Sequence, residues 1–465
     1  MNAHAPSSQY LGQYKASQLI ADDINAYLVQ HQHKSMLRFI TCGSVDDGKS
    51  TLIGRLLYDS KMIFEDQLAA LEADSKRVGT QGQDIDFALL VDGLAAEREQ
   101  GITIDVAYRY FATERRKFII ADAPGHEQYT RNMVTAAAGS DAAVVLVDIT
   151  KLDTRATPLA LLPQTRRHSL LAQLLRVPSI VFAINKLDAV DDPGQAYAAV
   201  RDALLAFAEQ AGMAVAGIVP VSALRGDNVT QPPRASQDTL RAWADWYDGP
   251  SLLQLLESLP TAQERKDGDL LLPVQYVARE GEGTGNQPRT LWGRIAHGTV
   301  RAGDPVQVFP SGVTAVVAEV RVAGATVDVA DAGISAGVVL DRQVDVSRGD
   351  WIATPQAVQA AQRFTATLAW LDTEPAQLGR KYWVRHGNRW VQARITEIAS
   401  RLDIHTLAAT DAHELNVNDI GAVTIETQQP LPVEAYATNR VGGSAIIVDP
   451  ATNRTSGALL VTAAA

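Results

Sequence analysis

A glycine-rich segment near the start of the chain has the residue types and the spacing that bind phosphate groups. It matches the pattern G-x-x-x-x-G-K-[ST] and one residue beyond, in Gly43, Ser44, Val45, Asp46, Asp47, Gly48, Lys49, Ser50 and Thr51. Its glycines let backbone N–H groups curl around phosphate oxygens, and a helix that follows presents its positive end to them. In this pattern Lys49 reaches the β- and γ-phosphates, and the Ser50 hydroxyl binds Mg²⁺. The segment therefore predicts a site for a nucleoside triphosphate and Mg²⁺.

A second motif, D-x-x-G followed by histidine, predicts the cleavage chemistry. It consists of Asp122, Ala123, Pro124, Gly125 and His126, directly after the expected strand Lys117 to Ile120. We expect Asp122 to hold Mg²⁺ through a water and the Gly125 N–H to meet the γ-phosphate. His126 is placed to orient the attacking water, a task that other phosphate-cleaving switches give to glutamine. The motif favours hydrolysis of the terminal phosphate.

A threonine between these two motifs predicts a switch. Thr103 lies in the run Glu97 to Ile104. Its hydroxyl and carbonyl can close over Mg²⁺ only when the γ-phosphate is present, which would order the segment in one nucleotide state alone. The expected metal ligands are Ser50, Thr103 and Asp122.

Two later motifs predict which base is bound. Asn185, Lys186 and Asp188 form N-K-x-D after an apolar run, and a third loop contains Ser222, Ala223 and Leu224. The Asp188 carboxylate can accept hydrogen bonds from guanine N1–H and the 2-amino group, which adenine does not offer, so adenine would leave it unpaired. A backbone N–H of the third loop would reach guanine O6. The expected nucleotide is GTP.

The elements that must position these motifs alternate in type up to about Pro260. Short apolar strands are expected at Leu37 to Thr41, Lys117 to Ile120, Ala142 to Val147, Ile180 to Ile184 and Ile218 to Val221, with helical stretches between them. This alternation is typical of a parallel sheet with crossover helices. After Pro260 a charged linker leads to short, alternating, glycine-punctuated segments, such as Leu272 to Val277 and Phe364 to Trp370, which favour barrels.

The expected architecture is an α/β P-loop GTPase domain followed by two β-barrel domains. We assign residues 1–34 to an N-terminal helical extension and 35–262 to the GTP-binding domain. The two barrels are assigned to 268–356 and 362–465.

Composition narrows the class of partner. The 465 residues include 42 Lys and Arg against 53 Asp and Glu, a net charge of −11, so a nucleic-acid backbone gains no overall attraction. The single cysteine, Cys42, cannot form an internal disulfide and is expected as a small residue that ends a buried strand. Apolar runs are far shorter than the roughly 18 residues of a membrane span, and the first residues lack a secretory signal. We expect a cytoplasmic protein that binds neither nucleic acid nor membranes.

Several segments that nucleotide chemistry does not dictate show a family resemblance. Through Gly101 to Ile104 and the D-x-P-G-H motif, the chain resembles the translation-factor class of GTPases, whose members carry a GTP-binding domain and two β-barrels. More narrowly, it looks like the large, GTP-hydrolysing subunit of bacterial sulfate adenylyltransferase. That likeness is carried by Val45 to Leu57, Asp74 to Arg77, Leu89 to Leu94, Glu97 to Phe111, Gly125 to Asn132 and Gln164 to Ser169.

The resemblance implies a reaction and a partner. GTP hydrolysis would be coupled to the formation of adenosine 5′-phosphosulfate and pyrophosphate from ATP and sulfate, in sulfate assimilation. The sequence contains no second phosphate loop, so the adenylylating site is expected on a small catalytic subunit of the ATP-pyrophosphatase type. No fused adenylylsulfate kinase is expected. The chain departs from the family pattern at Ala123, where threonine is usual, and in the longer segment Asp148 to Gln164.

Two alternatives remain open from the residues. One is an elongation-factor-like GTPase that acts with aminoacyl-tRNA and the ribosome, although the expected barrels carry mixed charges and no run of lysines. The other is a GTP-regulated binding module without an enzyme partner. For His168, beside two arginines, we favour a solvent-facing position over one facing the switch.

Overall fold

The computed structural model describes residues 34–60, 71, 75, 85–91, 106–125, 130–233, 243–261, 266–279 and 289–464. Contacts between residues divide the chain into two compact units. The first takes its described residues from Met1–Gly125, Ala136–Leu161 and Val177–Thr261, and the second from His126–Thr135, Leu162–Arg176 and Ala262–Ala465. The N-terminal helix expected before residue 34 lies outside the described residues, as do Thr103 and His126.

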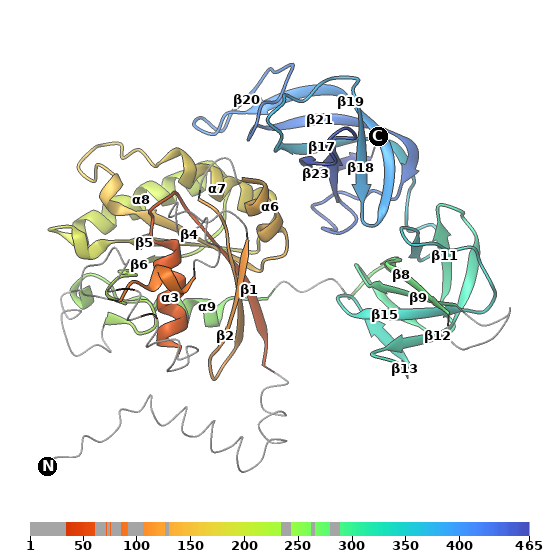
Figure 1. Ribbon diagram of the computed structural model, residues 1–465, viewed down its shortest axis with the longest axis horizontal. Coiled ribbons are helices and arrows are strands. Elements are labelled where there is room, and N and C mark those ends of the chain that lie inside the picture. Colours follow the sequence, from red (N-terminus) through yellow and green to blue (C-terminus); the bar gives the residue numbers. More distant parts are fainter. Residues whose placement is uncertain are drawn as a thin grey trace, which may run out of the picture. The chain divides into compact units, whose positions relative to one another are not determined.

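The first unit is built on a six-stranded sheet in the order β2-β3-β1-β4-β5-β6 (Figure 1). Its strands are β1 (Met36–Cys42), β2 (Ala107–Ala112), β3 (Lys117–Asp122), β4 (Ala142–Asp148), β5 (Ser179–Asn185) and β6 (Val215–Pro220). Neighbours pair in parallel except β2, which runs antiparallel to β3. Every residue of β4 and β5 is buried, which is typical of central strands in a parallel sheet. The predicted α/β fold is confirmed.

Capping residues explain where two helices of the first unit begin. α8 (Pro193–Gln210) follows Asp192, whose carboxylate accepts the Gln195 N–H at 3.0 Å. α9 (Leu252–Ser258) begins with a capping box between Ser251 and Gln254. α9 packs on β6 at Gly217, where a Cβ atom would lie 2.6 Å from a Leu255 methyl group. Other helical elements described in this unit are α3 (Lys49–Asp59), η1 (Phe87–Leu90), η3 (Ile149–Lys151) and η4 (Leu187–Ala189), while α6 (Thr130–Ala138) has residues in both units.

The first barrel of the second unit follows the path β7-β16-β11-β12-β15-β9-β8, with β13 beside β12. The strands are β7 (Leu271–Pro273), β8 (Tyr276–Arg279), β9 (Arg289–Arg294), β11 (Pro305–Phe309), β12 (Thr314–Val322), β13 (Ala325–Val327), β15 (Ser335–Leu340) and β16 (Trp351–Ala353). A two-stranded ribbon joins β10 (Thr299–Arg301) to β14 (Val329–Asp331). The single strand expected from Leu272 to Val277 is wrong. Two strands occupy this stretch, because Val274 bonds to Asp350 and Gln275 to Trp292 across the break.

The second barrel is closed. Its order is β18-β22-β23-β17-β21-β19-β20, and a further pairing joins β18 to β19. The strands are β17 (Ala361–Trp370), β18 (Lys381–His386), β19 (Arg389–Leu402), β20 (Ala409–Thr410), β21 (Ile420–Leu431), β22 (Ser444–Val448) and β23 (Thr455–Ala464). Burial alternates along β17 and β18, so one face of each supplies the apolar core and the other lies outside. We propose that the GTP-binding domain spans residues 35–262 and that the two barrels span residues 268–356 and 362–465.

A helix from the middle of the chain groups with this second barrel. α7 (Pro163–Leu174) lies in the second unit, where Arg166 Nε donates to the Ile404 carbonyl at 2.9 Å. At the other end of the helix, the Tyr436 hydroxyl donates to the Leu175 carbonyl at 2.7 Å. Within the described ranges, no helix combines the length and the hydropathy needed to cross a bilayer.

Candidate nucleotide-binding site

The sequence motifs of the first unit meet at one edge of its sheet. The glycine-rich loop follows β1, Asp122 ends β3, Asn185 ends β5, and Ser222 follows β6. Because β1, β3, β4, β5 and β6 are parallel, their carboxyl ends lie at the same edge, where open α/β sheets bind ligands.

The phosphate loop has a backbone shape that requires glycine at its end. Gly48, just before α3, has φ of 89°, and a Cβ atom there would collide with Asn185 Nδ2. No side chain caps the N-terminus of α3. The capping residue Gly48 therefore does not itself compete for the first N–H groups of the helix, which suits a helix that binds phosphate.

The phosphate-loop lysine is held inside the loop. Lys49 Nζ donates to the Ser44 carbonyl at 2.7 Å and to the Gly43 carbonyl at 3.1 Å. Burial lowers the pKa of Lys49, whereas the nearby carboxylates of Asp122 and Asp47 raise it. The ammonium group therefore sits in the concavity where a phosphate chain would bind.

The D-x-P-G segment lies against the same loop. Asp122 is buried, and its Oδ1 is 3.3 Å from the Thr41 hydroxyl, which donates to it. The Ala123 N–H donates to the Thr41 carbonyl at 3.2 Å, and Pro124 is also buried. A Cβ atom on Gly125 would collide with Lys49 Nζ. The structure thus brings Gly125 next to the lysine expected to hold the γ-phosphate.

Three successive carbonyls of the phosphate loop accept bonds from neighbouring loops of the sheet edge. Lys151 Nζ donates to the Val45 carbonyl at 2.5 Å, and Lys186 Nζ donates to the Asp46 carbonyl at 2.6 Å. Asn185 Nδ2 donates to the Asp47 carbonyl at 2.8 Å. We call these three contacts the carbonyl clamp. Its donors come from the ends of β4 and β5, so the sheet edge itself fixes the loop.

Buried carboxylates accompany the lysines of the clamp. The Asp47 carboxylate accepts the Ser44 N–H at 2.6 Å and pairs with Lys151 Nζ at 2.9 Å. Asp148 ends β4, and its Oδ2 lies 2.7 Å from Lys186 Nζ and 3.8 Å from Lys151 Nζ. Burial raises the pKa of Asp47, and the hydrogen bond from Lys151 lowers it. The two lysines and the two carboxylates balance each other in charge.

The loops expected to read the base are tied together by Asn185. Its Oδ1 accepts the Ala223 N–H at 2.9 Å, so this asparagine joins the phosphate loop to the loop after β6. Asp188 is half-buried, and its Oδ2 lies 3.8 Å from Arg225 Nε. The Leu224 carbonyl accepts a bond from Arg55 of α3 at 3.5 Å. The arrangement leaves the Asp188 carboxylate with a weak partner that a base can replace.

The structure does not describe every predicted site residue, and the sequence motifs missed some residues of the site. Thr103 and His126 lie outside the described residues, so their predicted roles stay predictions. The preference for a solvent-facing His168 is wrong, because this side chain is buried on α7. Lys151 and Asp148 were not identified from motifs. The signal available in the sequence was their position at the end of an apolar run, Ala142 to Val147.

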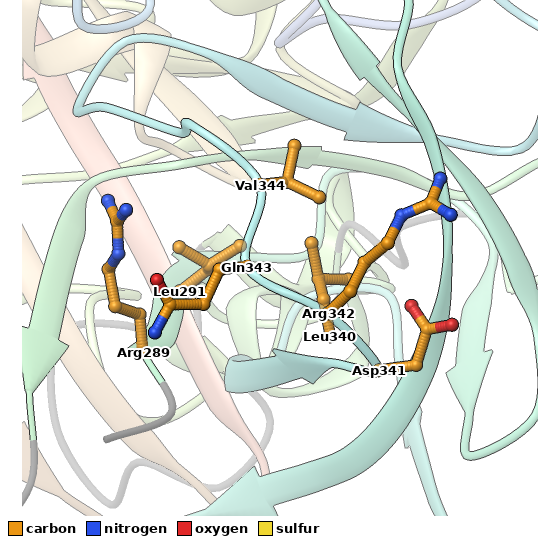
Figure 2. Close-up of a pocket in the computed structure, with 7 residues that line it drawn as sticks. All are labelled: Arg289, Leu291, Leu340, Asp341, Arg342, Gln343 and Val344. Atoms are coloured by element: carbon orange, nitrogen blue, oxygen red, sulfur yellow. The ribbon is translucent and has the colours of Figure 1, made fainter. Parts of the chain in front are cut away.

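A separate pocket lies in the first barrel. It has a volume of about 200 Å³ and is lined by Arg289, Leu291, Leu340, Asp341, Arg342, Gln343 and Val344. Figure 2 shows its two arginines at opposite ends, and Arg342 donates to the Thr314 carbonyl. The arginines do not converge, so the pocket lacks a focused anion site. Searched across the described stretches, the chain contains no group of three or more His, Cys, Asp or Glu side chains that could hold a metal.

Comparison with known proteins agrees with this geometry. Residues 34–264 match the family model "Elongation factor Tu GTP binding domain", and residues 363–462 match "GTP-eEF1A C-terminal domain-like". The loops at the sheet edge and these matches define a GTP-binding domain of the elongation-factor type.

Named relatives of the chain show more specifically which family it belongs to. The chain is 45% identical over 450 residues to sulfate adenylyltransferase subunit 1 of Laribacter hongkongensis, covering 96% of this chain and 89% of that protein. It is 46% identical to the Cellvibrio japonicus protein of the same name, over 96% of this chain and 90% of the relative. The bifunctional enzyme CysN/CysC of Xylella fastidiosa is 48% identical over 93% of this chain and 66% of its own length. The chain belongs to the family of sulfate adenylyltransferase subunit 1.

Proposed function

We propose that this chain is the GTP-hydrolysing subunit of a sulfate adenylyltransferase. It would couple GTP hydrolysis to the formation of adenosine 5′-phosphosulfate and pyrophosphate from ATP and sulfate. The observation that supports a GTPase most strongly is the meeting of the phosphate loop, Gly125 and the N-K-x-D loop at one sheet edge. The family supports the coupled reaction.

The γ-phosphate is the group on which the proposed cleavage residues act. On binding GTP, the Lys49 ammonium exchanges its carbonyl partners in the loop for oxygens of the β- and γ-phosphates. The Gly125 N–H, next to Lys49, donates to the γ-phosphate. His126 follows Gly125 in sequence and orients the attacking water. Thr103 closes the switch when the γ-phosphate is present.

The residues present suit Mg²⁺ bound together with a nucleotide. Ser50 offers a hydroxyl on α3 and Asp122 a buried carboxylate, both hard oxygen donors. One carboxylate is too few for a cage made of protein alone, and Mg²⁺ characteristically takes its other ligands from water and substrate phosphates. When bound, Mg²⁺ neutralises charge on the phosphate oxygens. Thr103 would be its third protein ligand.

Guanine recognition is assigned to Asp188 and the loop after β6. The carboxylate accepts the N1–H and the 2-amino group. Since the Ala223 N–H already donates to Asn185, we assign the bond to guanine O6 to the Leu224 N–H. Ser222 supports this loop, because its hydroxyl oxygen accepts the Arg225 N–H at 3.1 Å.

The proposed partner is the small catalytic subunit, of the ATP-pyrophosphatase type, which would bind ATP and sulfate. The support is the name of this chain's relatives, sulfate adenylyltransferase subunit 1, because a numbered subunit implies a partner subunit. A cytoplasmic location is proposed from the single, unpaired cysteine. Neither nucleic acid nor a membrane is a proposed partner.

The test measures pyrophosphate release from ATP plus sulfate by the chain copurified with its partner subunit, with and without GTP. We expect GTP to stimulate release in the wild-type complex. Lys49→Ala should abolish the stimulation, and the surface variant Lys266→Met should retain it. No release, together with GTP hydrolysis that rises only when ribosomes are added, would overturn the proposal in favour of a translation-factor function.

A further inference from the structure

We propose that Lys151, which belongs to none of the nucleotide-binding motifs, is a positioning residue that sets guanine-nucleotide affinity by shaping the phosphate loop. It is the third donor of the carbonyl clamp, beside Asn185 and Lys186 of N-K-x-D. The inference rests on GTP binding by the first unit alone. It does not depend on the sulfate reaction or on a partner subunit.

The clamp determines which way the loop's peptide groups face. In a trans peptide unit, the carbonyl of one residue and the N–H of the next point in opposite directions. The carbonyls of Val45, Asp46 and Asp47 are bonded to donors at the ends of β4 and β5. We infer that the N–H groups that follow them face the opposite side, where a phosphate chain would bind. Lys151 fixes the first of these three peptide units.

Lys151 also holds the carboxylate that closes the loop. Asp47 is fully buried, and a buried carboxylate is costly unless it is paired and hydrogen-bonded. It has both partners here, the Ser44 N–H at 2.6 Å and Lys151 Nζ at 2.9 Å. The bond to Ser44 spans the loop, so Lys151 supports the loop twice, through the Val45 carbonyl and through Asp47.

The position of Lys151 makes it suited to this task. Its backbone lies in η3, directly after β4, and β4 is paired with β1, the strand that leads into the loop. Its Nζ donates to two groups of the loop, the Val45 carbonyl and the Asp47 carboxylate, and we infer that it supports the loop without binding phosphate itself. About a third of its side chain is exposed, which leaves room for arginine at this position.

The test is isothermal titration of the full-length chain with GDP and with a non-hydrolysable GTP analogue. Lys151→Met should raise both Kd values about tenfold or more and by similar factors, with the binding stoichiometry retained. Similar factors are expected because the clamp shapes the whole loop and Lys151 does not touch the γ-phosphate. Lys151→Arg should recover most of the affinity.

A double-mutant cycle separates positioning from general damage. Asp47→Asn combined with Lys151→Met should lose less affinity than the product of the two single losses, because each single variant already removes the Asp47–Lys151 ion pair and the double variant removes it only once. The matched control is Lys266→Met, which breaks an exposed Lys–Asp pair of 3.0 Å in the other unit and should leave Kd unchanged.

Two results would overturn the inference. One is a Kd for Lys151→Met within twofold of wild type. The other is a reduced stoichiometry with an unchanged Kd, which would show that Lys151 only stabilises the fold. Both are distinct from a failure of the proposed function, because nucleotide titration needs neither ATP, sulfate nor the partner subunit.

Discussion

The nucleotide edge of the first unit and the barrels of the second unit use charged residues in opposite ways. At the edge, Asp47, Asp122 and Asp148 are almost wholly buried and are held by hydroxyl, ammonium or backbone donors. In the barrels the large core clusters are apolar, and the ion pair Arg394–Glu426 is exposed on both sides.

This difference in the burial of charged residues indicates that binding a nucleotide requires an arrangement that folding alone does not. Burying carboxylates costs free energy that an apolar core would not cost, so a stable fold alone gives no reason for the arrangement at the edge. A polyanionic ligand does give one, because it needs donors and cations fixed in advance. The large core clusters of the barrels are apolar, and barrel stability should respond to changes there without affecting nucleotide binding.

The largest effect is expected at the nucleotide edge. His126→Ala should slow GTP hydrolysis about 10²- to 10⁴-fold and leave GTP affinity intact, because in the proposed mechanism the side chain orients the water and does not hold the nucleotide. Single-turnover hydrolysis and nucleotide titration measure the two quantities. Equal turnover in the variant would assign His126 a structural role and weaken the contrast between the regions.

A core change in the second barrel should show the opposite pattern. Phe364 is fully buried in the apolar cluster, and Phe364→Ala should lower the free energy of unfolding by about 3–5 kcal/mol. The affinity for GTP should stay within twofold. Hydrogen exchange of the full-length chain in increasing urea, analysed in peptides from residues 361–464, shows whether the loss of stability lies in this barrel. A matching loss of GTP affinity would mean that the two regions are not independent.

The preference for guanine should depend on the Asp188 carboxylate. Asp188→Asn should weaken GTP binding about tenfold to a hundredfold and improve binding of xanthosine triphosphate, whose 2-oxo group needs a donor in place of an acceptor. Competition between the two triphosphates measures the change. An unchanged preference would remove Asp188 from the base site.

Acid should destabilise the second barrel through a buried histidine. Burial lowers the pKa of His386 to about 4, and its Nε2 lies 2.9 Å from the Gly442 carbonyl. The unfolded chain binds the proton with a pKa of about 6.5, so stability is retained above that pH and is lost as the pH falls toward 4. At pH 5 the loss should be about 2 kcal/mol.

The control for this prediction is His386→Gln, which removes the titrating group. The experiment measures the free energy of unfolding of residues 361–464 within the full-length chain, in urea, between pH 7 and pH 5. This free energy should depend less on pH in the variant than in the wild type, even if the variant is less stable at pH 7. Identical slopes would exclude His386 as the cause.

The smallest effect is expected for a surface charge. Arg394→Ala breaks a 3.0 Å pair between side chains that are 55% and 43% exposed, and should change stability by about 1 kcal/mol or less. Thermal unfolding measures it. A larger loss would mean that barrel surface charges resemble those of the nucleotide edge.

The sequence predicted five of the six strands of the first unit, because each of the five is an apolar run and four of them lead into a motif. It missed β2, much of which alternates between half-buried and exposed residues. The expected strand Ala142 to Val147 is β4 with one residue added. Apolar pattern alone could not reveal the break after Pro273, since bonds to Asp350 and Trp292 decide it and both partners are distant in sequence.

The same limit applies to the site. Motif spacing predicted a shared site for Lys49, Asp122, Asn185 and the loops around them, because phosphate and base chemistry fix those residue types, and the structure places these loops at one sheet edge. Lys151 bonds to the Val45 carbonyl and to Asp47 of the loop and belongs to no ligand-binding motif, so no ligand pattern marks it. Its role depends on β4 lying beside β1, which is a property of the strand order.

The burial of Cys42 has a practical consequence for measuring motion between the units. This thiol ends β1, has no exposed surface, and has a pKa raised by burial to about 12, so thiol-reactive dyes will not modify it in the folded protein. As it is the single cysteine of the chain, the native sequence is already a background for site-specific labelling. A cysteine introduced at an exposed position in each unit would give a two-dye distance reporter of the nucleotide cycle without removing any native residue from the core.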